Sequence, residues 1–200
     1  MSKKEIRAMM AQFRVQQNDG EPTKIIGYAA RFNELSEEMW GMREKIAPGA
    51  FTEAIGKSDV RALWNHDPNY VLGRTKNKTL TLREDEQGLF YEVTPPDAQW
   101  ARDLIESIKR GDVDQSSFAF TVEKGGDEWD EVSTPAIRTI NKIKELFDVS
   151  PVTYPAYPTA TSGVRSMQEV AEEHKAEKKA QETSIAPDFL REKLDLEEVM

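Results

Sequence analysis

Apolar and polar residues alternate along most of the chain in short runs, which Gly, Pro, Asn and Asp interrupt, from about residue 12 to residue 165. This two-residue period is typical of strands that bury one face. The segment Asp97–Gly111 differs, because its apolar residues recur at the helical spacing i, i+3, i+4 and i+7. A shorter helix is expected over Pro48–Ile55. The pattern therefore predicts an α+β, mainly-β domain with few helices.

The expected helix over Asp97–Gly111 has signals at both ends. Asp97 is of a residue type that commonly caps helix N-termini, and Gly111 is of the type that ends a helix in the left-handed conformation. The residues of its single apolar face are Ala101, Leu104, Ile105 and Ile108. We therefore expect this helix to pack on the strands with that face.

Both ends of the chain differ in composition from the alternating region. Residues 1–11 form a short charged lead-in, and residues 166–200 contain no glycine and a single aromatic residue, Phe189. The latter segment has ten acidic and five basic residues, so it carries −5 of the formal net charge of −9. We expect a lead-in at 1–11, one domain at 12–165, and a charged tail at 166–200 that is helical or disordered.

Composition excludes several classes of function. The chain has no cysteine, so disulfides, thiol nucleophiles and cysteine metal sites are absent, and two histidines are too few for a three-histidine zinc site. No phosphate-binding glycine motif is present, and we expect no cofactor and no metal. The acidic balance argues against a general nucleic-acid binder. Without an apolar run of ~20 residues or a signal-peptide core, an intracellular protein is expected.

The stretch GDVDQSSFAF over Gly111–Phe120 places two adjacent serines just inside a predicted strand. Side chains alternate along a strand, so Ser116 shares a face with Phe118 and Phe120, while Ser117 shares the other face with small residues. The aromatic face should be buried, which leaves Ser117 where a substrate can approach. If either serine is a nucleophile, the alternation favours Ser117; the alternative is that both are ordinary strand residues.

A serine nucleophile needs a base, and that base needs an acceptor to orient it. His66 is the candidate base, because the other histidine, His174, lies in the tail. The alternative for His66 is a structural histidine. Asp148 lies in an otherwise apolar strand, where a carboxylate is costly unless a group such as an imidazole N–H pairs with it. Asp67, beside His66, is the competing acid, and a surface charge facing water is the competing interpretation of Asp148.

Five stretches of the chain together resemble a known family. In order they are GYAARFN, EKIAPGAF, LWNHDPNYVLGRT, IKRGDVDQSSFAF and LFDVSPVTYPAYPTA, and they span roughly residues 24–166. They are similar to blocks of the prohead (capsid maturation) proteases of HK97-type tailed phages. The resemblance implies a herpesvirus-assemblin-like fold, a β-barrel flanked by helices. It also implies a serine endopeptidase that cuts scaffold segments from the capsid protein and cuts itself.

The resemblance assigns roles residue by residue. The family's histidine falls on His66, its serine on Ser117, and its acidic third member on Asp148, where more relatives are expected to carry Glu. Because Asp is shorter than Glu, its strand must lie closer to His66. Arg138 and Arg165 flank the relevant strands and are candidates for contacts to an oxyanion, with ordinary salt bridges as the alternative.

The resemblance also implies partners and a location. The expected partners are the precursor of the major capsid protein with its scaffold segment, the protease itself through autoprocessing, and a further copy in a homo-oligomer; neither nucleic acid nor a membrane is expected. The expected location is the host cytoplasm, inside the immature procapsid. Two alternatives remain open: a catalytically silent β-barrel that serves as a shell or scaffold component, and a small hydrolase with a different substrate.

Overall fold

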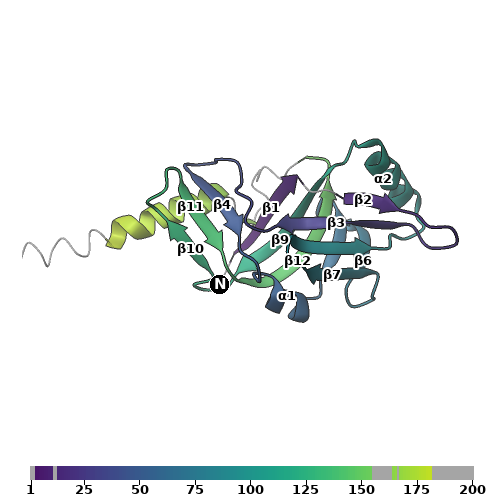
Figure 1. Ribbon diagram of the computed structural model, residues 1–200, viewed down its shortest axis with the longest axis horizontal. Coiled ribbons are helices and arrows are strands. Elements are labelled where there is room, and N and C mark those ends of the chain that lie inside the picture. Colours follow the sequence, from purple (N-terminus) through teal and green to yellow (C-terminus); the bar gives the residue numbers. More distant parts are fainter. Residues whose placement is uncertain (1–2, 11–12, 155–163, 166, 182–200) are drawn as a thin grey trace, which may run out of the picture.

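The computed structural model describes residues 3–10, 13–154, 164–165 and 167–181. Within these ranges the chain is mainly β, with few helices (Figure 1). Its largest sheet has six strands in the order β13-β1-β9-β12-β5-β6. Their bounds are β1 (Lys4–Met10), β5 (Arg61–Trp64), β6 (Asp67–Arg74), β9 (Gln115–Val122), β12 (Ile143–Val152) and β13 (Val164–Arg165).

Two smaller sheets complete the β structure of the described residues. A four-stranded sheet has the order β2-β3-β8-β7, and a three-stranded sheet has the order β10-β11-β4. The strands of the first are β2 (Phe13–Gln16), β3 (Lys24–Arg31), β7 (Leu80–Glu84) and β8 (Gly88–Val93). Those of the second are β4 (Met42–Ile46), β10 (Asp127–Asp130) and β11 (Ala136–Ile140).

The sheets are open, and this corrects the expectation of a closed barrel. In the described residues, the six-stranded sheet ends at β13 on one side and at β6 on the other, and these two strands do not pair with each other. The mainly-β character predicted from the alternating pattern is confirmed. A closed barrel requires the end strands to pair with each other. The alternating pattern predicts strands, but it does not predict whether a sheet closes. The likeness to herpesvirus assemblins stays a prediction.

The helices are α1 (Thr52–Lys57), α2 (Gln99–Arg110) and a helix over residues 167–181. The predicted stop of α2 is confirmed, because Gly111 has a φ of 80° and its N–H donates to the carbonyl groups of Ile108 and Ser107. The predicted cap is wrong: Ala98 is the N-cap, and Asp97 forms an ion pair with Arg102 instead. No helix among the described residues is both long and apolar enough to cross a membrane.

A single large apolar core joins the six-stranded sheet to the four-stranded sheet and to both labelled helices. Phe118 and Phe120 of β9 stack in this core with 4.9 Å between their ring centroids, and Phe51 meets Phe118 edge to face. Leu104 and Ile108 of α2 are buried in the same core, as their helical spacing predicted. The aromatic face of β9 is thus the core face, which directs the side chain of Ser117 to the other face of the sheet.

The N-terminal segment is more structured than the composition suggested, and part of the predicted tail forms a helix, one of its two predicted alternatives. Lys4–Met10, placed by sequence in the lead-in, form β1 inside the largest sheet, between β13 and β9. In the region predicted as a tail, residues 167–181 form a helix that buries Met167, Val170 and Ala171 against Met42 of the three-stranded sheet. Figure 1 shows this helix and the three-stranded sheet at one end of the molecule, with α2 at the other. Residues 182–200 of the predicted tail lie outside the described residues.

Candidate active site

Strand β9 places Ser117 in the interior of the six-stranded sheet. Ser117 pairs with Ala8 of β1 on one side and with Ser150 of β12 on the other. Residues that face each other in an antiparallel pair project on the same side of the sheet, so these three side chains share a face. Ser117 is fully buried. The sequence pattern predicted its side correctly, but it did not predict that this face of β9 is covered.

The covering group is His66, which lies in a two-residue turn between β5 and β6. Asn65 and His66 have φ values of 54° and 58°, and two successive positive values are what a type I′ hairpin turn requires. Positive φ is uncommon for residues other than glycine, but asparagine and histidine are both enriched among those that adopt it. The turn is tied to the end of β12, since the Asn65 N–H donates to the carbonyl oxygen of Pro151 at 3.0 Å and the Thr153 N–H donates to Asn65 Oδ1 at 2.9 Å.

This turn brings three of the predicted residues into one row. His66 Nε2 lies 2.6 Å from Ser117 Oγ, and His66 Nδ1 lies 2.5 Å from Asp148 Oδ1. Asp148 pairs with Ala119 of β9, two residues beyond Ser117 on the same face, so the short carboxylate reaches the ring. Asp148 is 3% exposed and the His66 side chain 14%. The carboxylate that the sequence marked as costly to bury is therefore paired with the imidazole.

The proton positions follow from the partners of each atom. Asp148 accepts the Nδ1 proton, which leaves Nε2 of the neutral ring free to accept the Ser117 hydroxyl proton. Ser117 Oγ also lies 2.9 Å from the backbone carbonyl oxygen of Arg7. A hydroxyl has one proton, so it donates to Nε2 when the ring is neutral. It donates to Arg7 when the ring is protonated and Nε2–H points at Oγ.

Two side chains that the sequence analysis missed also contact Asp148. The buried Ser150 hydroxyl donates to Asp148 Oδ1 at 2.9 Å and lies 3.4 Å from His66 Nδ1. The ammonium group of Lys4 lies 3.6 Å from Asp148 Oδ2. Ser150 could have been found from sequence, since it follows Asp148 by two residues on a strand and so shares its face. Lys4 could not, because only the pairing of β1 with β9 brings it near.

The competing residues have other contacts. Ser116 Oγ donates to the carbonyl oxygen of Ser150 at 3.4 Å, on the opposite side of β9 from His66. Asp67 Oδ1 accepts hydrogen bonds from the backbone N–H and the side-chain amide of Asn69, at 2.8 Å each. The structure therefore brings Ser117 and Asp148 to His66, and it leaves Ser116 and Asp67 in local contacts.

Arg138, a candidate for oxyanion contacts, lies in a separate buried ion cluster. Its guanidinium donates to Glu5 and Glu44 at 2.8 Å and to Asp127 at 2.7 Å. Arg7 joins the cluster through 2.6 Å contacts to Glu5 and Glu44. Arg138 thus has the salt-bridge role that was its alternative. The side chain of Arg165 lies outside the described residues.

The charges in this ion cluster control each other's ionisation. Burial by itself lowers the pKa of Arg138, but the carboxylates of Glu44 and Glu5 outweigh that effect and hold it above its ordinary value. Burial likewise raises the pKa of Glu44, and the guanidinium groups of Arg7 and Arg138 outweigh burial and hold it below its ordinary value. The charged forms of Arg138 and Glu44 are therefore favoured in spite of their burial.

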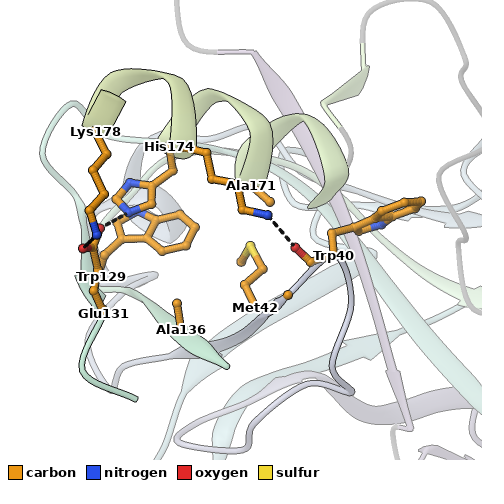
Figure 2. A pocket seen from close by; sticks show the side chains of 10 residues that line it. Trp40, Met42, Trp129, Glu131, Ala136, Ala171, His174 and Lys178 are labelled. Carbon is orange, nitrogen blue, oxygen red and sulfur yellow. Dashed lines mark hydrogen bonds and ion pairs between the residues drawn. The ribbon is translucent and has the colours of Figure 1, made fainter. Parts of the chain in front are cut away.

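The second histidine has a structural role at the helix over residues 167–181 (Figure 2). The His174 ring stacks on Trp129 with 3.8 Å between the ring centroids. Its Nε2 lies 2.7 Å from Glu131 Oε1, and the Glu131 carboxylate also pairs with Lys178. Figure 2 shows these groups beside a small hollow, which Trp40 and Met42 also line. None of the residues lining this hollow belongs to the row of Ser117, His66 and Asp148.

Comparison with known proteins agrees with the family suggested by the sequence motifs. A solved structure of the bacteriophage T4 capsid assembly protease, gp21, matches over 74% of this chain and 98% of that one, with 11% identity and a TM-score of 0.43. No curated protein sequence matches the chain. The family model described as caudovirus prohead serine protease matches residues 11–175. This match covers well over half of the sequence, and the chain therefore belongs to the caudovirus prohead serine protease family.

Proposed function

We propose that this prohead maturation protease is a serine endopeptidase with Ser117 as nucleophile, His66 as general base and Asp148 as the group that orients the imidazole. One observation supports the proposal above all others. Three side chains from β9, the β5–β6 turn and β12 form a continuous row, with contacts of 2.6 Å and 2.5 Å, in the order that acyl transfer requires. The roles that the family resemblance assigned fall on the same three residues.

The chemistry follows from this arrangement. As Ser117 Oγ attacks the carbonyl carbon of a peptide bond, its proton passes to His66 Nε2. Asp148 keeps the Nδ1 proton directed towards itself and stabilises the imidazolium that forms. His66 then gives the proton to the leaving amine, which departs as the acyl-enzyme forms. Water, deprotonated by the same nitrogen, then attacks the ester. His66 gives this proton to Ser117 Oγ as the acyl group leaves.

The approach of the substrate is limited to one side. Ser117 itself is fully buried, while the adjoining side chains of His66 and Ala8 are partly exposed. A peptide must therefore reach the Ser117 hydroxyl over the His66 ring and the surface of β1. We propose that the natural substrates are the scaffold segment of the capsid-protein precursor and the protease chain itself, cut inside the immature shell.

The test compares two neighbouring serines. Ser117→Ala and Ser116→Ala remove the same atom from adjacent residues of β9, but only Ser117 contacts His66. Each variant is co-expressed with the capsid-protein precursor, and each purified protein is treated with a serine-directed fluorophosphonate. We expect Ser117→Ala to abolish precursor cleavage, self-cleavage and labelling. Ser116→Ala should retain all three.

Other outcomes identify the alternatives. Cleavage that continues unchanged in Ser117→Ala would contradict the proposed nucleophile. A wild-type protein that neither labels nor cleaves would support the catalytically silent shell component. A wild-type protein that labels at Ser117 but never cuts the precursor or itself would point to a hydrolase with a different substrate.

A further inference from the structure

The N-terminal strand lies directly beside the strand that carries Ser117. Ala8 of β1 faces Ser117, and Ile6 faces Ala119, so both share the surface of the sheet on which His66 and Asp148 lie. Because side chains alternate along a strand, Lys4 projects on this surface as well. The neighbouring positions Glu5 and Arg7 project on the opposite surface, where they join the buried ion cluster.

Lys4 completes the set of contacts around Asp148. The two oxygens of this buried carboxylate have different partners: Oδ1 contacts His66 and Ser150, whereas Oδ2 lies 3.6 Å from the Lys4 ammonium group. The ammonium also lies 5.0 Å from the centroid of the Phe147 ring, a cation–π contact. The Lys4 side chain is 35% exposed, so its charged end reaches water while still neutralising a carboxylate that is nearly closed off from solvent.

We propose that Lys4 is a positioning residue for the reaction and that the N-terminal strand is therefore part of the active site. The ammonium attracts Oδ2 and holds it away from the ring. Oδ1 then stays directed at His66 Nδ1. Without this charge, the buried carboxylate has less to offset the cost of its desolvation, and it is less constrained in rotation. This inference rests on the proposed roles of Ser117, His66 and Asp148.

The contacts of β1 on its other side hold Lys4 in place. β13 pairs in parallel with β1, with Lys4 opposite Val164. Lys3, just before the strand, lies 3.1 Å from Glu173 of the helix over residues 167–181. Lys3 has the same charge as Lys4 and is adjacent to it in sequence, yet its contact is with an exposed helix carboxylate. It therefore provides a matched control for the removal of one lysine at this end of the chain.

The experiment measures the rate at which a fluorophosphonate labels Ser117 in the full chain, together with the melting temperature. We expect Lys4→Met to lower the labelling rate roughly 3- to 10-fold, because the lost ion pair is partly exposed and acts through Asp148. Lys3→Met should label at the wild-type rate. Lys4→Arg should restore most of the rate, since it returns the charge, and all three variants should melt within a few degrees of the wild type.

Each remaining outcome has a defined meaning. Equal rates for Lys4→Met and Lys3→Met would overturn the role of Lys4 and leave the proposed catalytic residues intact. A loss in Lys4→Met that Lys4→Arg does not restore would assign the effect to packing and would overturn the proposal as well. A wild-type chain that does not label at all would overturn the proposed function, and this inference with it.

Discussion

Two buried polar clusters lie on opposite faces of β1, and they are built differently. On one face, Lys4 approaches Asp148, which continues to His66 and Ser117. On the other, Glu5 and Arg7 alternate with Glu44 and Arg138 in a closed network of two carboxylates and two guanidinium groups, to which Asp127 adds a third carboxylate. The first cluster is a row that contains a histidine, whereas the second contains only carboxylates and guanidinium groups.

The difference shows what burial of charge can accomplish in one fold. In the ion cluster, Glu5 and Glu44 each contact both guanidinium groups, so the charges offset each other and hold β1 against β4 and β11. In the row, the charge on Asp148 is directed through one imidazole to one hydroxyl. A closed network favours a single arrangement of the chain, while a row ending in a hydroxyl can move a proton. The ion cluster should therefore determine stability, and the row of Ser117, His66 and Asp148 should determine the reaction rate.

The largest effect should come from Asp148→Asn. The amide keeps the size of the side chain but no longer holds the Nδ1 proton in place, so the Ser117 labelling rate should fall by roughly 10⁴-fold. The melting temperature should change by only a few degrees, because the amide is isosteric and can still accept from Ser150. Labelling kinetics and thermal unfolding of the same preparation check this. A labelling rate within tenfold of wild type would contradict the proposed role of Asp148 in orienting His66.

Arg138→Met should have the opposite profile. Removing the guanidinium leaves Glu5 and Glu44 buried with one cation fewer, and loss of one partner of a buried ion pair typically costs about 3–5 kcal/mol of folding free energy. Chemical denaturation should report this loss. The Ser117 labelling rate per folded molecule should stay within about twofold of wild type at low temperature. A large loss of rate with normal stability would mean that Arg138 acts in the reaction.

A pH series should separate the two clusters in a single protein. The pKa of Glu44 is lower in the folded chain than its ordinary value, despite burial, because of Arg7 and Arg138. Its contribution to stability is therefore present above the unfolded pKa of about 4.3 and is lost as pH falls through the lower folded value. Labelling should fall with pH for a different reason, because a protonated imidazole cannot accept the Ser117 proton.

The measurement follows labelling rate and unfolding free energy from pH 8 down to pH 3. Activity that is lost while the fold is intact, followed by loss of stability in more acidic buffer, would support the comparison. A labelling rate that stays flat from pH 8 to pH 5 would contradict the role of His66. A simultaneous loss of rate and fold would mean that the two clusters are not independent.

The sequence predicted the parts of this site that depend on local pattern. Alternation along β9 separated Ser117 from Ser116, and the cost of an unpaired carboxylate made Asp148 a candidate beside Asp67, which the family resemblance then favoured. Neither argument uses more than the residues of one strand, which is why both could be made without coordinates. The I′ turn that carries His66 over Ser117 could not be predicted in the same way, because its two central residues are not glycine and positive φ is uncommon for any other residue.

The parts that the sequence did not predict depend on contacts between distant segments. The charged residues of β1 favour a lead-in over an inner strand, yet Glu5 is buried and Arg7 is largely covered by partners on β4 and β11. Sheet closure failed as a prediction for the same reason, since it is decided by whether end strands meet. Burial of the Ser117 face is likewise set by the His66 turn, which no pattern within β9 can reveal.

The strand order of the largest sheet has a consequence for timing during synthesis. Arg7 and Ser117 are 110 residues apart in the chain, and Asp148 lies near the end of β12. Residues up to Val152 must therefore leave the ribosome before the hydroxyl, imidazole and carboxylate can come together. Strand β1 likewise cannot pair with β9 until β9 has been synthesised. Contacts between such distant segments also form slowly. A nascent chain thus cannot assemble the candidate active site until β12 has been synthesised.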